Sequence, residues 1–323
     1  MRVAVDAWNL VDDRRGMGRY VRRVLRDWRE ERGLEVTLIV RKAAHAAELS
    51  REFPYAVRRE RRGSYDAVWY PWNALRFTLP GARSLVLFHD AFAFTHAHRS
   101  WIARHREQAP IRRALARADA RSANSLWTAR EFARLFGLDA ASFTVIHPVP
   151  DPFWQPAQAP QRPPFVLAVA GPEERKNIPT LKAAFARAFP AGGCELVIAG
   201  NAPGATIAPS DDELRALYSG ALAVAVPSSA EGYGLMAVEA MACGAAVIAS
   251  DASALPEACD GAALLVPPFD VEAWTRALRG VAEDDALRAT LRGRSLARAA
   301  RIDRSEPARL TLASLRRLLE GAR

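Results

Sequence analysis

Residues 221–244 read ALAVAVPSSAEGYGLMAVEAMACG. An apolar run of strand length, 221–226, passes through a turn with two glycines into a second apolar stretch of helical length. The same alternation of short apolar runs and longer amphipathic stretches continues along the chain in both directions. Because alternating strands and helices are typical of parallel sheets built from βαβ units, we predict an α/β fold.

The predicted elements fall into two series. In the first half we expect strands at 3–6, 36–40, 67–70, 85–88 and 144–146, and helices at 18–28, 102–118 and 128–136. In the second half we expect strands at 165–170, 195–199, 221–226, 246–249 and 263–266, and helices at 178–188, 213–218, 235–243, 271–281, 285–300 and 307–319. Nearly all the strands are apolar throughout, so helices are expected on both faces of each sheet.

Seven prolines lie between residues 148 and 164, where neither a helix nor a central strand can continue. This stretch is predicted to link two Rossmann-like domains, 1–160 and 161–305. The last helix, within 306–323, is expected to be able to pack back on the first domain. Ligands of open α/β sheets bind beyond the carboxyl ends of the strands, so the cleft between the domains is the expected site.

The composition of the 323 residues, 50% hydrophobic and 25% charged, is that of a globular protein. No apolar run approaches the roughly 20 residues of a membrane-spanning helix. Asp6 interrupts the first apolar stretch, which argues against a signal peptide. Cys194, Cys243 and Cys259 lie far apart and are expected to be reduced and packed. We therefore expect a cytoplasmic protein.

The basic residues are concentrated in the first domain. Residues 1–160 hold 27 Lys and Arg against 17 Asp and Glu, a net charge of +10, whereas residues 161–323 hold 18 against 19, a net charge of −1. The clusters at 58–62 and 112–113 could attract phosphates, an anionic membrane or an acidic polymer. The alternative is a solvated face rich in arginine, and the sequence favours it slightly.

The turn within 221–244 carries the most informative side chains. Gly232 and Gly234 would let backbone N–H groups approach a ligand, and the following helix N-terminus favours a phosphate or a hydroxyl-rich sugar. Glu239 falls inside that apolar helix, where a buried carboxylate needs hydrogen-bond donors such as ligand hydroxyls. The alternative is that Glu231 caps the helix and Glu239 reaches solvent or an arginine.

A second turn, 169–179 with the sequence VAGPEERKNIP, follows the first strand of the second domain. Arg175 and Lys176 in this turn are suited to neutralise a diphosphate, the Arg as a planar fork and the Lys as a point charge. Taken alone, an exposed charged turn is the favoured alternative.

Two further segments belong to the first domain. Gly16 and Gly18 form a short glycine loop, which is not a dinucleotide fingerprint because Val21 stands where the third glycine would be. His89 and Asp90 follow a predicted strand; His89 is a candidate site residue, with a structural cap as the equal alternative. The sequence has no Walker A, G-x-S-x-G, H-E-x-x-H or D-x-D motif, so we predict no metal.

Taken together, these segments resemble family 4 of the retaining glycosyltransferases, which have the GT-B fold. The spacing Glu231 to Glu239 is the E-x7-E signature of that family. Further segments match in order along nearly the whole chain: GMGRY at 16–20, HD at 89–90, NSLWTA at 124–129, RKN at 175–177 and ALLV at 263–266.

The resemblance implies roles for both domains: the second binds a nucleotide-sugar and the first binds the acceptor. The catalytic residues would be Glu231, His89, Lys176 and Arg175. The donor-binding residues would be Gly16, Gly18, Gly171, Gly232, Tyr233, Gly234, Leu235 and Glu239. Within this set, Glu239 would accept from the ribose hydroxyls, Lys176 and Arg175 would hold the diphosphate, and His89 would lie beside the donor sugar.

The implied activity is that of a retaining hexosyltransferase of surface polysaccharide or glycoconjugate synthesis, without metal or cofactor. GDP-mannose is the favoured donor, and the acceptor is a sugar or a lipid-linked sugar. The leaving phosphate would take the acceptor proton during front-face attack. The basic domain would allow peripheral contact with an anionic membrane, and no nucleic acid partner is expected. The alternatives are a non-catalytic GT-B subunit that docks on a membrane or polymer, and an inverting enzyme or epimerase.

Two departures from the family pattern concern the second domain. Pro172 stands where many relatives have an arginine, which would place more of the phosphate binding on Lys176. The segment between Gly200 and Asp211 is short, where relatives often have a further strand and a loop that contacts the base. The base of the donor therefore stays open.

Overall fold

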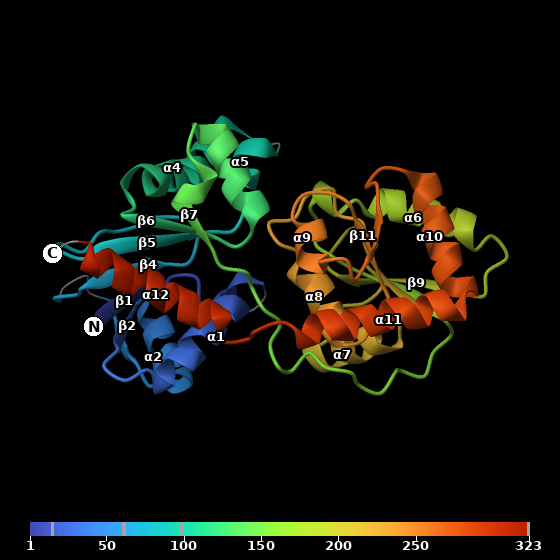
Figure 1. Ribbon diagram of the computed structural model, residues 1–323, viewed down its shortest axis with the longest axis horizontal. Helices are drawn as coiled ribbons and strands as arrows, with labels where there is room; N and C mark the ends of the chain where they lie inside the picture. Colours follow the sequence, from blue (N-terminus) through green and yellow to red (C-terminus); the bar gives the residue numbers. More distant parts are fainter. Residues whose placement is uncertain (14–15, 60–62, 97–99, 322–323) are drawn as a thin grey trace. The chain divides into compact units, whose positions relative to one another are not determined.

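The chain divides into two compact units in this computed structural model, which describes residues 1–13, 16–59, 63–96 and 100–321. Unit 1 comprises Met1–Pro148 and Ser305–Arg323, and unit 2 comprises Val149–Arg304. Each unit is an α/β domain with its own parallel sheet, as Figure 1 shows.

Unit 1 is built in chain order from β1 (Arg2–Asp6), α1 (Met17–Asp27), the 3-10 turn η1 (Trp28–Glu30), β2 (Glu35–Ile39), α2 (Ala43–Glu52), β3 (Ala56–Arg58), β4 (Ala67–Tyr70), β5 (Arg83–Phe88), α3 (Phe92–Thr95), α4 (Trp101–Arg117), β6 (Ala120–Ala123), α5 (Leu126–Phe136), η2 (Ala140–Ser142), β7 (Phe143–Val145) and, at the far end of the chain, α12 (Glu306–Glu320). Its strands are ordered β3-β2-β1-β4-β5-β6-β7.

Unit 2 is built from β8 (Phe165–Ala170), η3 (Glu174–Lys176), α6 (Ile178–Ala188), β9 (Glu195–Gly200), α7 (Asp211–Gly220), β10 (Ala223–Val226), α8 (Leu235–Ala242), β11 (Val247–Ser250), α9 (Leu255–Cys259), β12 (Leu264–Val266), α10 (Val271–Glu283) and α11 (Asp285–Ala300). Its strands are ordered β12-β11-β10-β8-β9. All strand pairs in both sheets are parallel. The predicted α/β class is therefore confirmed.

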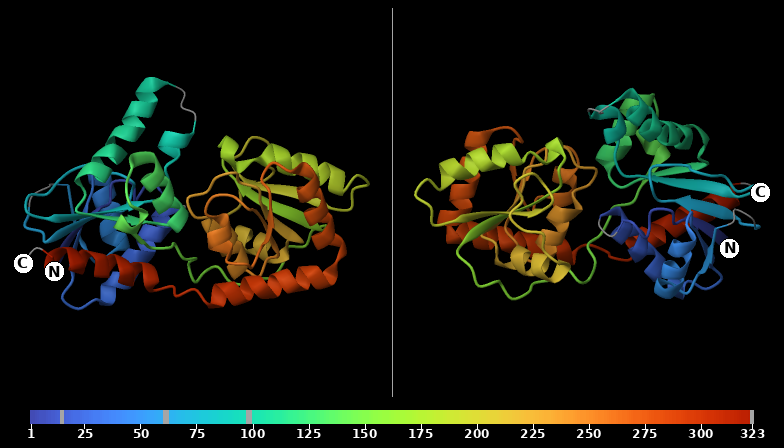
Figure 2. Two further views of the ribbon diagram at one scale, coloured as in Figure 1. Left: turned by 45° about the horizontal axis from the view of Figure 1, so that its top comes forward. Right: turned by 180° about the vertical axis from the view of Figure 1, so that it is seen from behind.

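Helices cover both faces of each sheet, as the two views of Figure 2 show. In β1, Val3 and Val5 belong to one buried cluster and Ala4 belongs to another. In β8, Leu167 lies in one cluster while Val166 and Ala168 lie in a second. Because successive side chains of a strand point to opposite faces, a strand between two helical layers must be apolar throughout.

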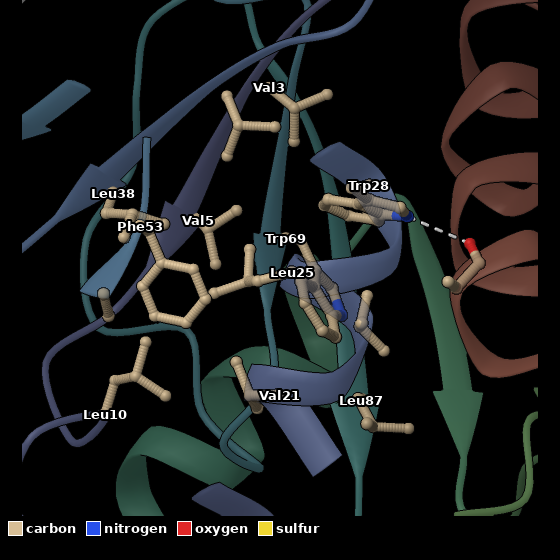
Figure 3. Close-up of a cluster of buried hydrophobic side chains, with 14 of the residues drawn as sticks. Val3, Val5, Leu10, Val21, Leu25, Trp28, Leu38, Phe53, Trp69 and Leu87 are labelled. Atoms are coloured by element: carbon tan, nitrogen blue, oxygen red, sulfur yellow. Dashed lines mark hydrogen bonds between the residues drawn. The ribbon is translucent and has the colours of Figure 1, made fainter. Parts of the chain in front are cut away.

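One face of the unit 1 sheet is covered by α1 and α12, and its core is drawn in Figure 3. Trp28, at the end of α1, packs on Trp69 of β4 with ring centroids 5.3 Å apart. The Trp28 indole Nε1 donates a hydrogen bond of 3.0 Å to the backbone carbonyl of Ala308 in α12. Leu312 and Leu315 of α12 are buried in the same cluster. The last helix thus completes the core of unit 1.

The boundary between the units lies at Pro148 and Val149, ahead of the boundary at residue 160 that the proline content suggested. Residues 149–160 group with unit 2 because Trp154 is buried in that unit's core. Its ring packs edge-on against Tyr218 of α7, with centroids 5.6 Å apart. Phe153 packs on the same cluster and the Ala157 N–H donates to Ser219 Oγ, so several contacts anchor this proline-rich stretch to unit 2.

Several elements are not foreseen by the sequence pattern, among them α2, β3, β6 and α9. Within α2 the buried side chains are His45 and Leu49, so no apolar stripe marks the helix. Strand β6 contains Arg121 and Ser122, and it pairs with β5 on one side and β7 on the other. No helix among the described residues combines the length and the apolar character that crossing a bilayer requires.

Candidate functional site

The turns that follow β8 and β10 meet at one edge of the unit 2 sheet. The two strands are parallel neighbours, with Ala223 paired to Val166 and Val224 paired to Leu167. Both turns therefore leave the sheet side by side. The Ser229 N–H donates to the carbonyl of Arg175 over 2.8 Å and joins them. The segments that the sequence picked out, 169–179 and 227–234, thus form a single site.

Three charged side chains meet where these turns touch. Lys176 Nζ donates to Glu231 Oε1 over 2.7 Å. Arg175 Nη1 donates to Glu231 Oε2 over 3.1 Å and to the Ala230 carbonyl over 3.0 Å. Both oxygens of one carboxylate are therefore each bound by a different cation.

Burial makes this ion cluster strong. Lys176 and Glu231 are each 8% exposed. Burial by itself would raise the pKa of Glu231, but the Lys176 ammonium and the Arg175 guanidinium outweigh it and hold that pKa below its ordinary value. Glu231 is therefore ionised at neutral pH. The two cations leave one positive charge uncompensated by this carboxylate, and the more distant Glu173 lies 3.8 Å from Arg175.

Asn177 fixes the shape of the first turn. Its backbone adopts the left-handed conformation, with φ of 53°. Its Nδ2 donates to the carbonyl of Pro227 over 3.1 Å and to that of Pro268 over 2.6 Å. An asparagine tolerates this conformation better than most side chains. Asn177 therefore ties the turn after β8 to two other loops of unit 2.

The second turn ends at the N-terminus of α8. Gly234 is the N-cap residue, with a φ of 105°, and a Cβ on it would lie 2.6 Å from Leu255 Cδ2. Because it is a glycine, it has no side chain to cap the helix. The Glu231 carboxylate, which was the predicted alternative cap, accepts from Lys176 and Arg175. The Glu231 N–H donates to Ser253 Oγ over 2.8 Å. The first N–H groups of a helix carry partial positive charge, which favours an anion.

Glu239 lies in α8 and is 4% exposed. The predicted alternative was that Glu239 reaches solvent or an arginine; its contact with solvent is wrong, and an arginine partner stays a prediction. Its carboxylate is close enough to Cys243 to add to the effect of burial, and together they raise the pKa of that thiol to about 12. The turn at Arg175 and Lys176 is likewise not the exposed charged turn that the sequence alone favoured.

The other predicted donor-binding residues of unit 2 surround these turns. Gly171 follows β8 directly, Gly232 lies in the second turn, and Leu235 is the first residue of α8. Tyr233 is buried against Val238 and Ala258, so its ring contributes to packing. Their roles toward a donor stay predictions.

His89 lies in unit 1, directly after β5, and is buried. Its ring Nε2 is 2.8 Å from the carbonyl of Pro71, which can only accept, so Nε2 carries the proton. Burial lowers the pKa of His89 to about 4, against a smaller opposing effect of the Pro71 carbonyl. His89 is therefore a neutral imidazole of fixed orientation at neutral pH. Its predicted place beside a donor sugar stays a prediction.

The glycine loop of unit 1 has a structural explanation of its own. Gly16 is the N-cap residue before α1 and has a φ of 47°. A Cβ on Gly18 would lie 1.8 Å from the backbone oxygen of Asp13, so no larger residue fits. Arg14 and Arg15, next to this loop, lie outside the described residues.

Asn177 and Ser253 are site residues for which the sequence analysis predicted no role. Asn177 is part of the quoted RKN segment, and its position before a helix was the available signal. Ser253 follows β11, and it reaches the site because β11 lies beside β10 in the sheet. In the part of the chain that the structure describes, no three His, Cys, Asp or Glu side chains are placed to hold a metal.

The site lies within the segment that resembles known proteins. Residues 163–284 match the family model described as glycosyl transferases group 1. The serotype-specific mannosyltransferase WbdA of Escherichia coli is 32% identical over 168 residues, which are 52% of this chain and 19% of WbdA. The chain thus spans about a fifth of the length of this curated relative.

Solved structures resemble the chain over its whole length. HepE of Anabaena, in complex with UDP-glucose, has a TM-score of 0.78 at 15% identity, covering 98% of this chain and 99% of its own. Sucrose-phosphate synthase of Thermosynechococcus elongatus has a TM-score of 0.73 at 20% identity, with 100% of both chains covered. Residues 163–284 thus resemble a group 1 glycosyl transferase domain, and the chain has the α/β GT-B fold.

Proposed function

We propose that the chain is a retaining glycosyltransferase that moves a hexose from a nucleoside-diphosphate sugar to a sugar or a lipid-linked acceptor. The observation that carries the proposal is the ion cluster of Arg175 with the buried Lys176 and Glu231, in the turns that lead to η3 and to the N-terminus of α8. Two cations and a helix N-terminus converge there from adjacent strands. Such an arrangement suits a diphosphate without need of a metal ion.

The chemistry follows from where charge develops. When the bond between the sugar and the diphosphate breaks, negative charge gathers on the departing phosphate. Lys176 is held in place by Glu231 before any ligand arrives, so it stabilises this charge with little reorganisation. In the proposed reaction the leaving phosphate oxygen accepts the proton of the acceptor hydroxyl, which attacks from the same face and so retains the configuration.

Glu231 serves as the internal counterion of this site. Lys176 and Arg175 would repel each other without a carboxylate between them, and their burial would be costly. An incoming diphosphate brings more negative charge than Glu231 alone. We propose that it shares the two cations with Glu231 and leaves the carboxylate facing the donor sugar.

Mannose is the proposed sugar and GDP-mannose the proposed donor. WbdA is named a mannosyltransferase, and this name supports the choice of sugar. The complex of HepE with UDP-glucose supports a nucleotide-sugar donor in general and leaves the base open. The buried Glu239 is proposed to accept hydrogen bonds from the ribose hydroxyls.

The decisive experiment titrates a panel of nucleoside-diphosphate sugars into the protein by calorimetry and follows transfer to sugar acceptors. We expect GDP-mannose to bind best, and we expect Lys176→Ala and Glu239→Ala each to lose transfer. Turnover like the wild type in both variants would end these assignments. The anomeric configuration of the product separates retention from inversion, and transfer in the presence of EDTA tests independence from metal.

A second candidate is a non-catalytic GT-B subunit whose basic unit 1 docks on an anionic membrane or polymer. The net charge of +10 in residues 1–160 favours it. Co-sedimentation with anionic vesicles combined with no binding of any donor would decide for this function.

A further inference from the structure

The loop that follows β4, residues 71–73, lies against the end of β5. Strands β4 and β5 are parallel neighbours, with Tyr70 paired to Val86, so the loop leaves the sheet beside the end of β5. Asn73 in this loop has a backbone φ of 58°, in the left-handed region. Asparagine enters this region more readily than most residues, but a side chain there still marks a position that its surroundings determine. The contacts of Asn73 explain its conformation.

The hydrogen bonds of Asn73 run to the end of β5. Its backbone N–H donates to the Leu87 carbonyl over 3.0 Å. Its side-chain Oδ1 accepts from the backbone N–H of His89, and its Nδ2 donates to the Asp90 carbonyl over 3.3 Å. One side-chain amide thus binds backbone groups of two consecutive residues, and it fixes the backbone that carries the His89 ring.

The same loop also holds the ring of His89. Nε2 of this ring donates to the Pro71 carbonyl over 2.8 Å, which leaves the lone pair of Nδ1 as the acceptor of the imidazole. Pro71 and the Asn73 amide therefore bind the same histidine, one at its ring and one at its backbone. The loop is fixed from its other side as well, because Trp72 Nε1 donates to the Asp6 carbonyl over 2.6 Å.

Two further contacts enclose His89. The Thr128 hydroxyl of α5 donates to the His89 carbonyl over 3.2 Å. The Tyr20 ring of α1 meets the imidazole edge-on, with ring centroids 6.1 Å apart. Neither contact is a hydrogen bond to a ring nitrogen, so neither determines the tautomer. The loop 71–73 therefore decides which nitrogen of His89 carries the proton.

Unit 2 uses the same device in its own site. Asn177 is also left-handed, with a φ of 53°, and its Nδ2 donates to the carbonyls of Pro227 and Pro268. Asn177 directly follows Lys176, so it fixes the turn that carries the ion cluster. In each unit a left-handed asparagine after a parallel strand thus holds the residues of a predicted site.

We propose that Asn73 is a positioning residue of the transfer reaction: it holds the loop 71–73 against His89, so that the imidazole keeps its proton on Nε2 and presents Nδ1 as an acceptor to the substrate. The inference rests on the proposed function and deepens it, because a sugar offers hydroxyl groups that donate to such an acceptor. Asn73 acts through His89 and does not touch the substrate. Without its amide, the loop loses its hold on the strand end and the ring populates both tautomers.

The test combines kinetics with a spectroscopic readout of His89. Asn73→Gly removes the amide but keeps the backbone conformation, because glycine adopts positive φ without strain. Nitrogen-15 NMR of histidine-labelled protein at neutral pH reports the ring tautomer, and His89→Asn assigns the signal. We expect the Nε2-protonated form in the wild type and a mixture of both tautomers in Asn73→Gly. We expect kcat for transfer to fall by about 10–100-fold with little change in the KM for the donor.

A double-mutant cycle separates positioning from a merely structural role. In a His89→Ala background, Asn73→Gly should cause no further loss of transfer, because the residue through which it acts is gone. Asn73→Asp keeps an acceptor for the His89 N–H and should restore the Nε2-protonated form. The matched control is Asp260→Gly, which changes an exposed residue of unit 2 with a φ of 46° and should alter neither the NMR signal nor the rate.

Thermal unfolding verifies that each variant is folded. A wild-type NMR signal in Asn73→Gly would overturn the proposal, and so would an undiminished rate or an equal further loss in the His89→Ala background. If the wild type transferred no sugar from any donor, the proposed function would fall together with the kinetic part of this inference. The NMR comparison alone would then decide whether Asn73 fixes the ring.

Discussion

The two units place very different groups at the ends of their parallel strands. In unit 2 the turns after β8 and β10 hold Lys176, Arg175 and Glu231 as a buried ion cluster. In unit 1 the residue after β5 is His89, which is buried as a neutral imidazole bound to a backbone carbonyl. Burial penalises charge in both places.

The difference shows how each unit reduces the free-energy cost of burying a charged group at these positions. Unit 2 keeps its charges and compensates them with one another, so that a change of partner, such as a diphosphate, can be accommodated. Unit 1 avoids charge at the end of β5, although it buries Asp6 at the end of β1, with Arg76 3.6 Å away. The ion cluster of unit 2 suits a reaction in which charge moves. The neutral His89 of unit 1 suits a fixed hydrogen bond.

The largest expected effect tests the ion cluster of unit 2. Lys176→Ala removes the cation proposed to stabilise the leaving diphosphate, and we expect kcat/KM for transfer to fall by about 10²–10³. Lys182→Ala, which changes an exposed lysine of α6, is the matched control and should leave the rate unchanged. Steady-state kinetics on both variants, with thermal unfolding to verify the fold, makes the comparison. Equal rates for the two variants would contradict the role of Lys176.

The next effect separates the counterion from the cations. Glu231→Gln keeps the shape of the side chain but removes the carboxylate that pairs with the buried Lys176, so we expect the free energy of unfolding to drop by about 3 kcal/mol. Urea denaturation at pH 7 measures it. Glu174→Gln, an exposed neighbour in the same turn, should change stability by less than about 0.5 kcal/mol.

A third effect distinguishes the units by pH. Burial lowers the pKa of His89 to about 4 in the folded protein, from an ordinary value of about 6.5. Between pH 6.5 and pH 4 the unfolded chain therefore binds a proton at His89 more readily than the folded chain does. This stability is complete above about pH 6.5 and is lost as the pH falls toward 4, by at most about 3 kcal/mol. The lowered pKa of Glu231 has the same sign, but its loss begins only below about pH 4.5.

Denaturant unfolding at pH 7 and pH 5 checks the His89 contribution. His89→Asn should make stability nearly independent of pH between these values, whereas His105→Asn, on the exposed part of α4, should keep the slope of the wild type. A slope that survives in His89→Asn would place the acid sensitivity elsewhere.

The smallest effect concerns matched tryptophans in the two cores. Trp28 donates to the Ala308 carbonyl over 3.0 Å in unit 1, and Trp274 donates to the Pro267 carbonyl over 3.1 Å in unit 2. Replacing either with Phe removes one hydrogen bond and leaves a smaller ring in the core, at a cost of about 1–2 kcal/mol. Amide hydrogen exchange should show faster opening of α12 in Trp28→Phe and no change there in Trp274→Phe.

Much of this fold was predictable because its strands are apolar on both faces. The apolar runs at 165–170 and 221–226 predict buried parallel strands. Strand β6 could not be predicted from the residues Ala120–Ala123, because its stability comes from pairing with neighbours on both sides. Helix α2 was not predicted either, because its buried side chains are only His45 and Leu49 and no apolar stripe marks it.

The candidate site was predictable in its members but not in their contacts. The sequence singled out Lys176, Arg175 and Glu231 as separate groups facing a ligand. That they bind one another depends on β8 and β10 being neighbours, a fact of strand order. Sequence patterns predict which residues of one helix or strand are buried better than they predict the contacts between different helices and strands.

The return of α12 to unit 1 has a consequence for the order of synthesis. Residues 149–304 leave the ribosome as one uninterrupted stretch and contain every strand of their sheet. The first 148 residues must wait, with the indole of Trp28 lacking the Ala308 carbonyl, until the later domain has been translated. The domain made first is therefore the one completed last, and a nascent chain halted before α12 would expose the apolar face that this helix covers.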